Sequence, residues 1–151
     1  MTETTGTTAV DLTAVPPLTH YHHMSITVCD VDRSEAWYRD VLGFQHAFIE
    51  THPDGGGHAV VMVRPETSLF LGLHHHDANG SEDFAEHRTG MDHVAIGVET
   101  REDLDRWIEH LDRHDVRRSE PVDGTIGDVT YTVLNFRDPD NIAIELIWMG
   151  A

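Results

Sequence analysis

The sequence has one cysteine, no lysine and no apolar run long enough to span a bilayer. Cys29 alone cannot form an internal disulfide, so nothing requires an oxidising compartment and we expect a cytoplasmic protein. A transmembrane helix needs roughly 20 apolar residues in succession, which no stretch supplies. The segment 1–18 has neither a basic start nor a hydrophobic centre, which argues against a secretory signal and favours a loosely ordered tail.

Positive charge is also scarce. Ten arginines face 27 acidic residues, which gives a formal charge of -17. Such a chain repels phosphates, so we expect no nucleic-acid partner and no anionic membrane partner. The 151 residues suit one compact domain. Histidine is abundant instead, with 13 residues of which several cluster, and this keeps metal chemistry open.

The chain contains an internal repeat. The run His22–Val28 returns seventy residues later as Met91–Val98, and at the same offset Trp37 matches Trp107. Repeats of this length indicate two copies of one module. We predict an α+β fold with a single domain at 19–151. Module one covers 19–76, a linker covers 77–90 and module two covers 91–149.

Each module is expected to have the order β-α-β-β-β, from alternating and helical hydrophobic spacing. In module one the predicted elements are strands at 19–29, 44–51, 58–64 and 68–74, with a helix at 33–42. In module two they are strands at 91–98, 116–119, 128–136 and 141–148, with a helix at 101–114 and a loop at 121–127.

Three candidate ligands arise from the facing of the strands. His23 and His93 occupy equivalent positions in the two modules, and Glu145 interrupts an apolar final strand. Two imidazoles and one carboxylate are a typical set for a divalent metal. The alternative is that both histidines are ordinary strand residues and that Glu145 pairs with a cation or lies at a sheet edge.

The segments HHMSITVCDVDRSEAWYRDVLGF, MDHVAIGVETREDLDRWIEHL and FRDPDNIAIEL resemble the vicinal oxygen chelate superfamily. That superfamily includes glyoxalases, extradiol dioxygenases, methylmalonyl-CoA epimerases and fosfomycin- or bleomycin-resistance proteins. The resemblance implies two tandem βαβββ modules whose curled mixed sheets surround a central cleft. It also implies one divalent metal that binds a small substrate through two neighbouring oxygens. The two modules of one chain, or modules of two chains in a homodimer, would form the cleft.

Carried over residue by residue, the resemblance places the metal ligands at His23, His93 and Glu145. Gly72 falls opposite Glu145, where glyoxalase-like members have a fourth ligand. His74 keeps the facing of Gly72 and is a candidate fourth ligand or acid–base group. His75 and His76 are interpreted as a solvated strand end.

Two histidines and one carboxylate with open positions also form the facial triad of non-haem iron oxygenases. The resembled dioxygenases have a tyrosine where this chain has Asn135; Tyr131 shares its facing and is the candidate substitute. We therefore predict a metalloenzyme of glyoxalase or dioxygenase type that uses Fe, Mn, Ni, Co or Zn. The alternative is a metal-free protein that binds a small molecule or sequesters an antibiotic. A transferase acting on a phosphonate would need more cationic groups.

Overall fold

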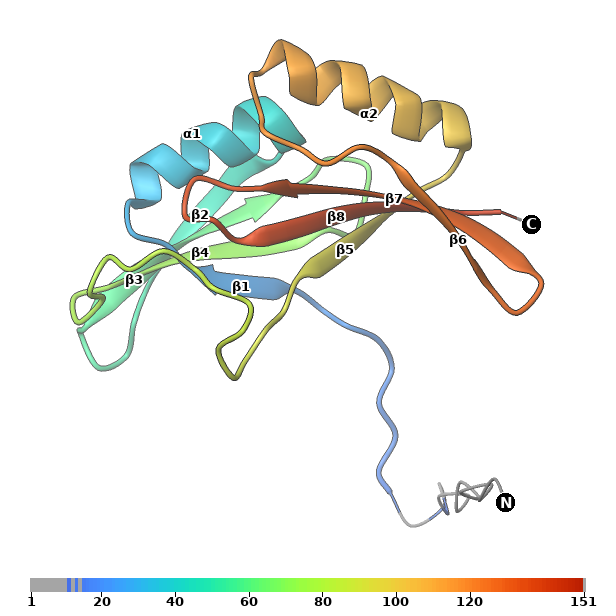
Figure 1. Cartoon of the computed structure of the whole chain (residues 1–151). Helices are drawn as coiled ribbons and strands as arrows, with labels where there is room; N and C mark the ends of the chain where they lie inside the picture. The colour runs from blue at the N-terminus through green and yellow to red at the C-terminus, as the bar shows by residue number, and fades with distance from the viewer. Residues whose placement is uncertain (1–10, 12, 14, 151) are drawn as a thin grey trace.

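The computed structural model describes residues 11, 13 and 15–150 (Figure 1). Most of the predicted tail at 1–18 therefore lies outside the described residues. The elements follow the predicted order twice. They are β1 (Met24–Thr27), α1 (Val31–Leu42), β2 (Gln45–Thr51), β3 (Gly57–Val63), β4 (Phe70–His76), β5 (Val94–Val98), α2 (Arg101–Arg113), β6 (Val122–Ile126), β7 (Val129–Arg137) and β8 (Ala143–Met149).

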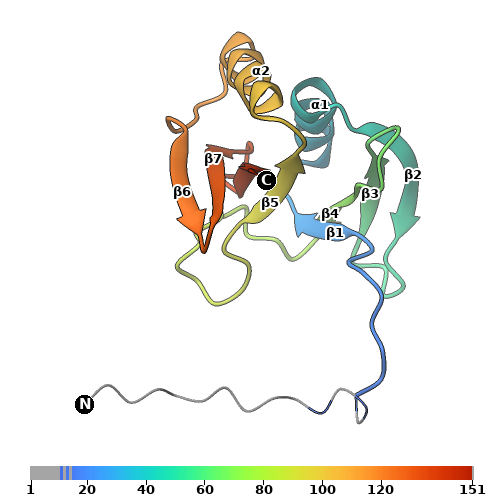
Figure 2. The same cartoon turned by 90° about the vertical axis from the view of Figure 1, so that its right-hand side faces the viewer.

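Each module forms its own four-stranded mixed sheet. The strand orders are β1-β4-β3-β2 and β5-β8-β7-β6, and the first strand of each module runs parallel to the last. Figure 2 shows the module-one sheet on one side, the module-two sheet on the other and both helices together above them. The predicted α+β fold of two tandem βαβββ modules is confirmed; the sheets are curled but not closed. Neither helix of the described residues is long and apolar enough to cross a membrane.

One hydrophobic core joins the two modules on the helix side of the sheets. Ile26 and Leu73 enter it from module one, and Ile144 and Leu146 enter it from module two; all are at most 5% exposed. Because side chains alternate along a strand, the residues between them face away from the helices. We call these two surfaces the open face of module one and the open face of module two.

The structure corrects one prediction in module two. The stretch 116–119 forms no strand, since only Arg118 bridges to Phe136. The third-from-last strand is instead β6, inside the stretch 121–127 that was predicted as a loop. It pairs with β7 through a two-residue turn in which Gly127 has φ +62°. Gly124 and Gly127 of the predicted loop thus belong to a tight hairpin.

The strand starts are also later than predicted. β1 begins at Met24 and β5 at Val94, so His23 and His93 each lie one residue before a strand. They remain at equivalent positions in the two modules.

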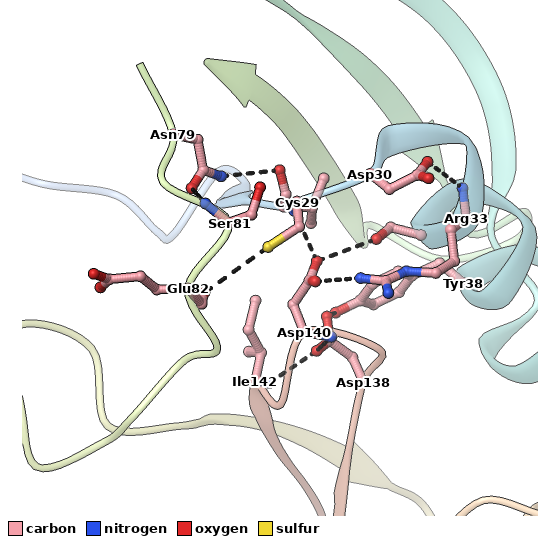
Figure 3. Close-up of polar contacts among 12 residues, drawn as sticks. Cys29, Asp30, Arg33, Tyr38, Asn79, Ser81, Glu82, Asp138, Asp140 and Ile142 are labelled. Atoms are coloured by element: carbon pink, nitrogen blue, oxygen red, sulfur yellow. Dashed lines mark hydrogen bonds and ion pairs between the residues drawn. The ribbon is translucent and has the colours of Figure 1, made fainter. Parts of the chain in front are cut away.

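A buried carboxylate pair fastens the two modules to each other (Figure 3). Asp138, in the turn between β7 and β8, accepts hydrogen bonds from Tyr38 Oη at 3.0 Å, Asp140 N at 2.9 Å and Ile142 N at 2.8 Å. Burial raises the pKa of Asp138, and burial followed by the Asp138 charge raises the pKa of Tyr38 well above its usual range. Tyr38 belongs to α1, so this contact crosses from module two to module one.

Asp140 forms a second set of contacts between the two modules, next to those of Asp138. It accepts from Cys29 N at 3.0 Å and forms an ion pair with Arg33. The turn that carries both aspartates is completed by Asn141 at φ +66°, a conformation that asparagine tolerates. The predicted turn before the last strand is therefore also the main polar junction of the fold.

Thr100→Ala is expected to lower the free energy of unfolding by about 1 kcal/mol, because it removes the N-cap of α2. Thr100 accepts from Asp103 N at 3.0 Å, and the Asp103 side chain accepts from Thr100 N at 3.2 Å in a capping box. Urea unfolding followed by circular dichroism measures the change. Thr89→Ala, at an exposed linker position, is the control; an equal loss in both variants would contradict the capping role.

Candidate functional site

Glu145 lies on the open face of module two. It sits in β8 between Ala95 of β5 and Asn135 of β7, and it is half-buried. The Glu145 carboxylate forms no hydrogen bond or ion pair with another residue in the described part of the chain. His93 lies two residues before Ala95, directly ahead of the first residue of β5. Its Nδ1 lies 2.6 Å from Asp92 Oδ1, a contact that holds the ring at the start of β5.

His23 occupies the position in module one that is equivalent to His93 in module two, one residue before β1. Its exposed ring lies beside His22, with 3.0 Å between the two Nδ1 atoms. The next open-face residue, Ser25, pairs with Gly72 of β4.

Gly72 has no side chain that could bind a metal, and neighbouring side chains fill the space where one would lie. A Cβ placed on Gly72 would lie 2.7 Å from Ser25 Oγ and 3.0 Å from His74 Nε2. The His74 ring therefore leans over the position where glyoxalase-like members of the resembled family have a fourth ligand. Burial and the neighbouring histidines lower the pKa of His74.

His74 belongs to a group of three histidines at one end of this face. His52 Nε2 lies 2.9 Å from His74 Nδ1, and the ring centroids of His52 and His76 are 4.6 Å apart. The metal-binding atoms of the three residues all lie within 4.8 Å of one another. Sequence reasoning selected His74 but missed His52 and interpreted His76 as solvated. His76 could have been found from the sequence because it lies two residues after His74 and so has the same facing in a strand. No sequence pattern indicated that His52 lies beside them.

Tyr131 lies in β7 on the open face of module two, four residues before Asn135. Its ring covers Gly124 of β6, where a Cβ would lie 2.4 Å from the ring. The hydroxyl thus lies toward the β6 side of the face, and the Tyr131–Met149 pair is four register pairs along the strand from the Asn135–Glu145 pair.

The described residues bring together only part of the predicted site. Glu145 lies in the sheet of module two and His93 directly precedes a strand of that sheet, whereas His23 directly precedes a strand of the other sheet. Among the described residues, the three potential ligands whose binding atoms lie within 4.8 Å of one another are His52, His74 and His76. The predicted trio of His23, His93 and Glu145 is not gathered in this way in a single chain.

The comparisons with known proteins agree with the fold and the repeat. The family model of the Glyoxalase/Bleomycin resistance protein/Dioxygenase superfamily matches residues 20–146. A glyoxylase/bleomycin resistance protein/dioxygenase domain from Frankia sp. EAN1pec is 30% identical, with a TM-score of 0.76 over 87% of this chain and 93% of that chain. A glyoxalase family protein from Enterococcus faecalis is 20% identical, with a TM-score of 0.66 over 85% of this chain and 96% of that chain.

A fosfomycin resistance protein, FosX, from Listeria monocytogenes is 15% identical, with a TM-score of 0.63 over 86% of this chain and 91% of that chain. At this identity the likeness shows the fold alone. No curated protein matches the sequence. The chain belongs to the Glyoxalase/Bleomycin resistance protein/Dioxygenase superfamily, that is, to the vicinal oxygen chelate proteins.

Proposed function

We propose that this protein is a divalent-metal-dependent enzyme whose small substrate binds the metal through two neighbouring oxygens. The ligands are His23, His93 and Glu145. The observation that carries the proposal is Glu145, a half-buried carboxylate on a largely apolar strand with no hydrogen-bond or ion-pair partner among the described residues. No side-chain oxygen in the described part of the chain is both buried and unpartnered, so the Glu145 carboxylate is reachable from the open face and free to bind a cation there.

The donor chemistry fits the metal that the superfamily implies. Two imidazoles and one carboxylate suit Fe, Mn, Co, Ni or Zn. Ser25 and His74 leave no room for a side chain at Gly72, so the site has three ligands and keeps positions open for substrate. A divalent ion bound there would polarise the substrate oxygens as a Lewis acid or, if it is iron, activate dioxygen.

Two residues on the open faces are proposed to move protons. His74 Nε2 stands over Gly72 beside Ser25, on the same face as His23. The Tyr131 hydroxyl stands on the face that carries Glu145. An imidazole and a phenol hydroxyl can each donate and accept a proton.

We further propose that the complete site is made by two copies of the chain. The open faces carry large apolar side chains that remain exposed in one copy, including Phe48 at 54% on module one and Val122 at 54% and Ile126 at 63% on module two. Pairing the open face of module one with the open face of module two of a second copy would cover them. It would also bring His23 of one copy to His93 and Glu145 of the other.

Elemental analysis of untagged protein, reconstituted with each candidate metal, tests the metal site. We expect His93→Ala and Glu145→Ala each to lose about one ion per chain relative to the wild type, because each removes one of three ligands. Glu109→Ala, an exposed glutamate on α2, is the control and should keep that ion. Equal metal content in all four proteins would reject the site and favour a metal-free binding or sequestering protein.

For the reaction, anaerobic Fe(II) loading followed by oxygen consumption with catechols separates ring cleavage from isomerase or lyase chemistry. Consumption lost in Glu145→Ala would assign the dioxygenase. Turnover of a carbonyl substrate without oxygen would assign the isomerase or lyase.

A further inference from the structure

We propose that His52, His74 and His76 form a second transition-metal site on module one, separate from the His23, His93 and Glu145 site. The three residues come from two segments that β3 holds together. His74 and His76 are two residues apart in β4 and therefore share the open face, while His52 follows the end of β2.

The backbone around His52 is fixed. His52 N donates to Gly57 O at 3.0 Å, and Asp77 N donates to Gly56 O at 3.0 Å, so the turn after β2 is tied to the end of β4. Gly57 also makes room for the ring, because a Cβ there would lie 2.9 Å from His52 Nδ1. A site held by strand ends and a short turn keeps its ligands in place before the metal arrives.

The spacing of the rings matches coordination by one ion. Two nitrogens bound to a tetrahedral metal at 2.0–2.1 Å are about 3.3 Å apart, and the centroids of their rings are about 5.2 Å apart. His52 Nε2 and His74 Nδ1 are 2.9 Å apart. The three centroid separations are 4.6, 5.1 and 6.0 Å, which lie on both sides of the expected value. Coordination by one ion requires His52 and His74 to separate by a few tenths of an ångström, His52 and His76 to separate by about 0.6 Å, and His74 and His76 to approach by about 0.8 Å.

The surroundings favour a cation. Glu50 and Asp54 are close enough for their charges to act on the cluster: Glu50 acts on His74, and Asp54 interacts with His52 and His76. Three imidazoles select zinc, nickel, copper or cobalt over magnesium and calcium. His76 is exposed, so the fourth coordination position opens to solvent and can take water.

Such an ion would act on His74 in particular. Metal on Nδ1 leaves the ring proton on Nε2, which is the nitrogen that stands over Gly72. The second ion therefore sets the tautomer that His74 presents to the open face, and it links the turn after β2 to β4.

Titration with Co²⁺ tests the site, because cobalt reports tetrahedral nitrogen coordination by strong visible absorption. The titration is done in untagged protein that carries His93→Ala and Glu145→Ala, so that the other site does not contribute. In this background we expect a saturable absorption band with one ion per chain, displaced by Zn²⁺. Adding His52→Ala or His76→Ala should weaken Co²⁺ binding by at least about tenfold. Loss of a residue that only hydrogen-bonds to a ligand already lowers metal affinity by about that factor, and these variants remove a ligand itself.

His75→Ala is the matched control. His75 lies between two of the ligands in β4, faces the other side of the sheet beside His58 and contacts Asp77. It should keep the Co²⁺ band and its affinity. His76 is exposed, so its replacement is not expected to disturb folding, which circular dichroism without metal verifies.

Absence of a Co²⁺ band in the His93→Ala, Glu145→Ala background would overturn the second site, as would equal affinity in the His76→Ala and His75→Ala variants. Neither result bears on the first site, whose ligands are not altered by His52→Ala or His76→Ala. A Co²⁺ band that survives while the first site binds nothing would support the second site alone.

Discussion

Coexpressing a His23→Ala chain with a Glu145→Ala chain is expected to restore metal binding that each variant lacks by itself. If the site combines module one of one copy with module two of the other, a mixed dimer holds one intact site and one site with both defects. Random pairing makes about half of the dimers mixed, so about a quarter of the wild-type sites should return. Both chains carry His52→Ala and His76→Ala, which remove two of the three ligands of the proposed second site, and elemental analysis counts the ions.

The matched control coexpresses His93→Ala with Glu145→Ala. Both defects fall on module two, so every site in a mixed dimer keeps one of them and no binding should return. Mass spectrometry of the intact dimers verifies that mixed pairs form. If mixed dimers form and neither pair restores metal, the two modules of one chain form the site together.

Asp138→Ala is expected to lower the free energy of unfolding by about 3 kcal/mol, because buried donors lose their acceptor. The hydroxyl of Tyr38 and the backbone N–H groups of Asp140 and Ile142 all donate to this carboxylate. Asp138 is 6% exposed, so little water reaches the donors. Urea unfolding, with the slope of the transition unchanged, measures the loss.

Asp138→Asn is the matched variant, since it keeps an oxygen acceptor and removes the charge. Its loss should be smaller than that of alanine. Burial raises the pKa of Asp138 in the folded chain, so ionisation costs stability. The stability of the wild type relative to Asp138→Asn should therefore be highest below the unfolded pKa and should fall as pH rises through the folded pKa. A pH-independent difference would show that the carboxyl does not titrate with folding.

The repeat and the hydrophobic periodicity determined the architecture before any tertiary information. Alternation along the last strand places Glu145 on the face opposite the helix-facing residues, as its pairing with Ala95 confirms, and the same rule predicts that His93 faces the same way. The turn at Asn141 also follows from local chemistry, since asparagine accepts positive φ. These features depend on residues close in sequence, and local spacing predicts them.

The tertiary structure decided which distant residues meet. His52 approaches His74 only because β3 pairs with both β2 and β4, and Asp138 finds Tyr38 100 residues away. The residues of β6 were predicted as a loop, and only their pairing with β7 makes them a strand. Strand pairing and packing set these contacts through long-range burial and hydrogen bonding, which local periodicity does not encode. The proposed ligands His23, His93 and Glu145 were therefore selected one by one from sequence, whereas the three-histidine cluster required the sheet register.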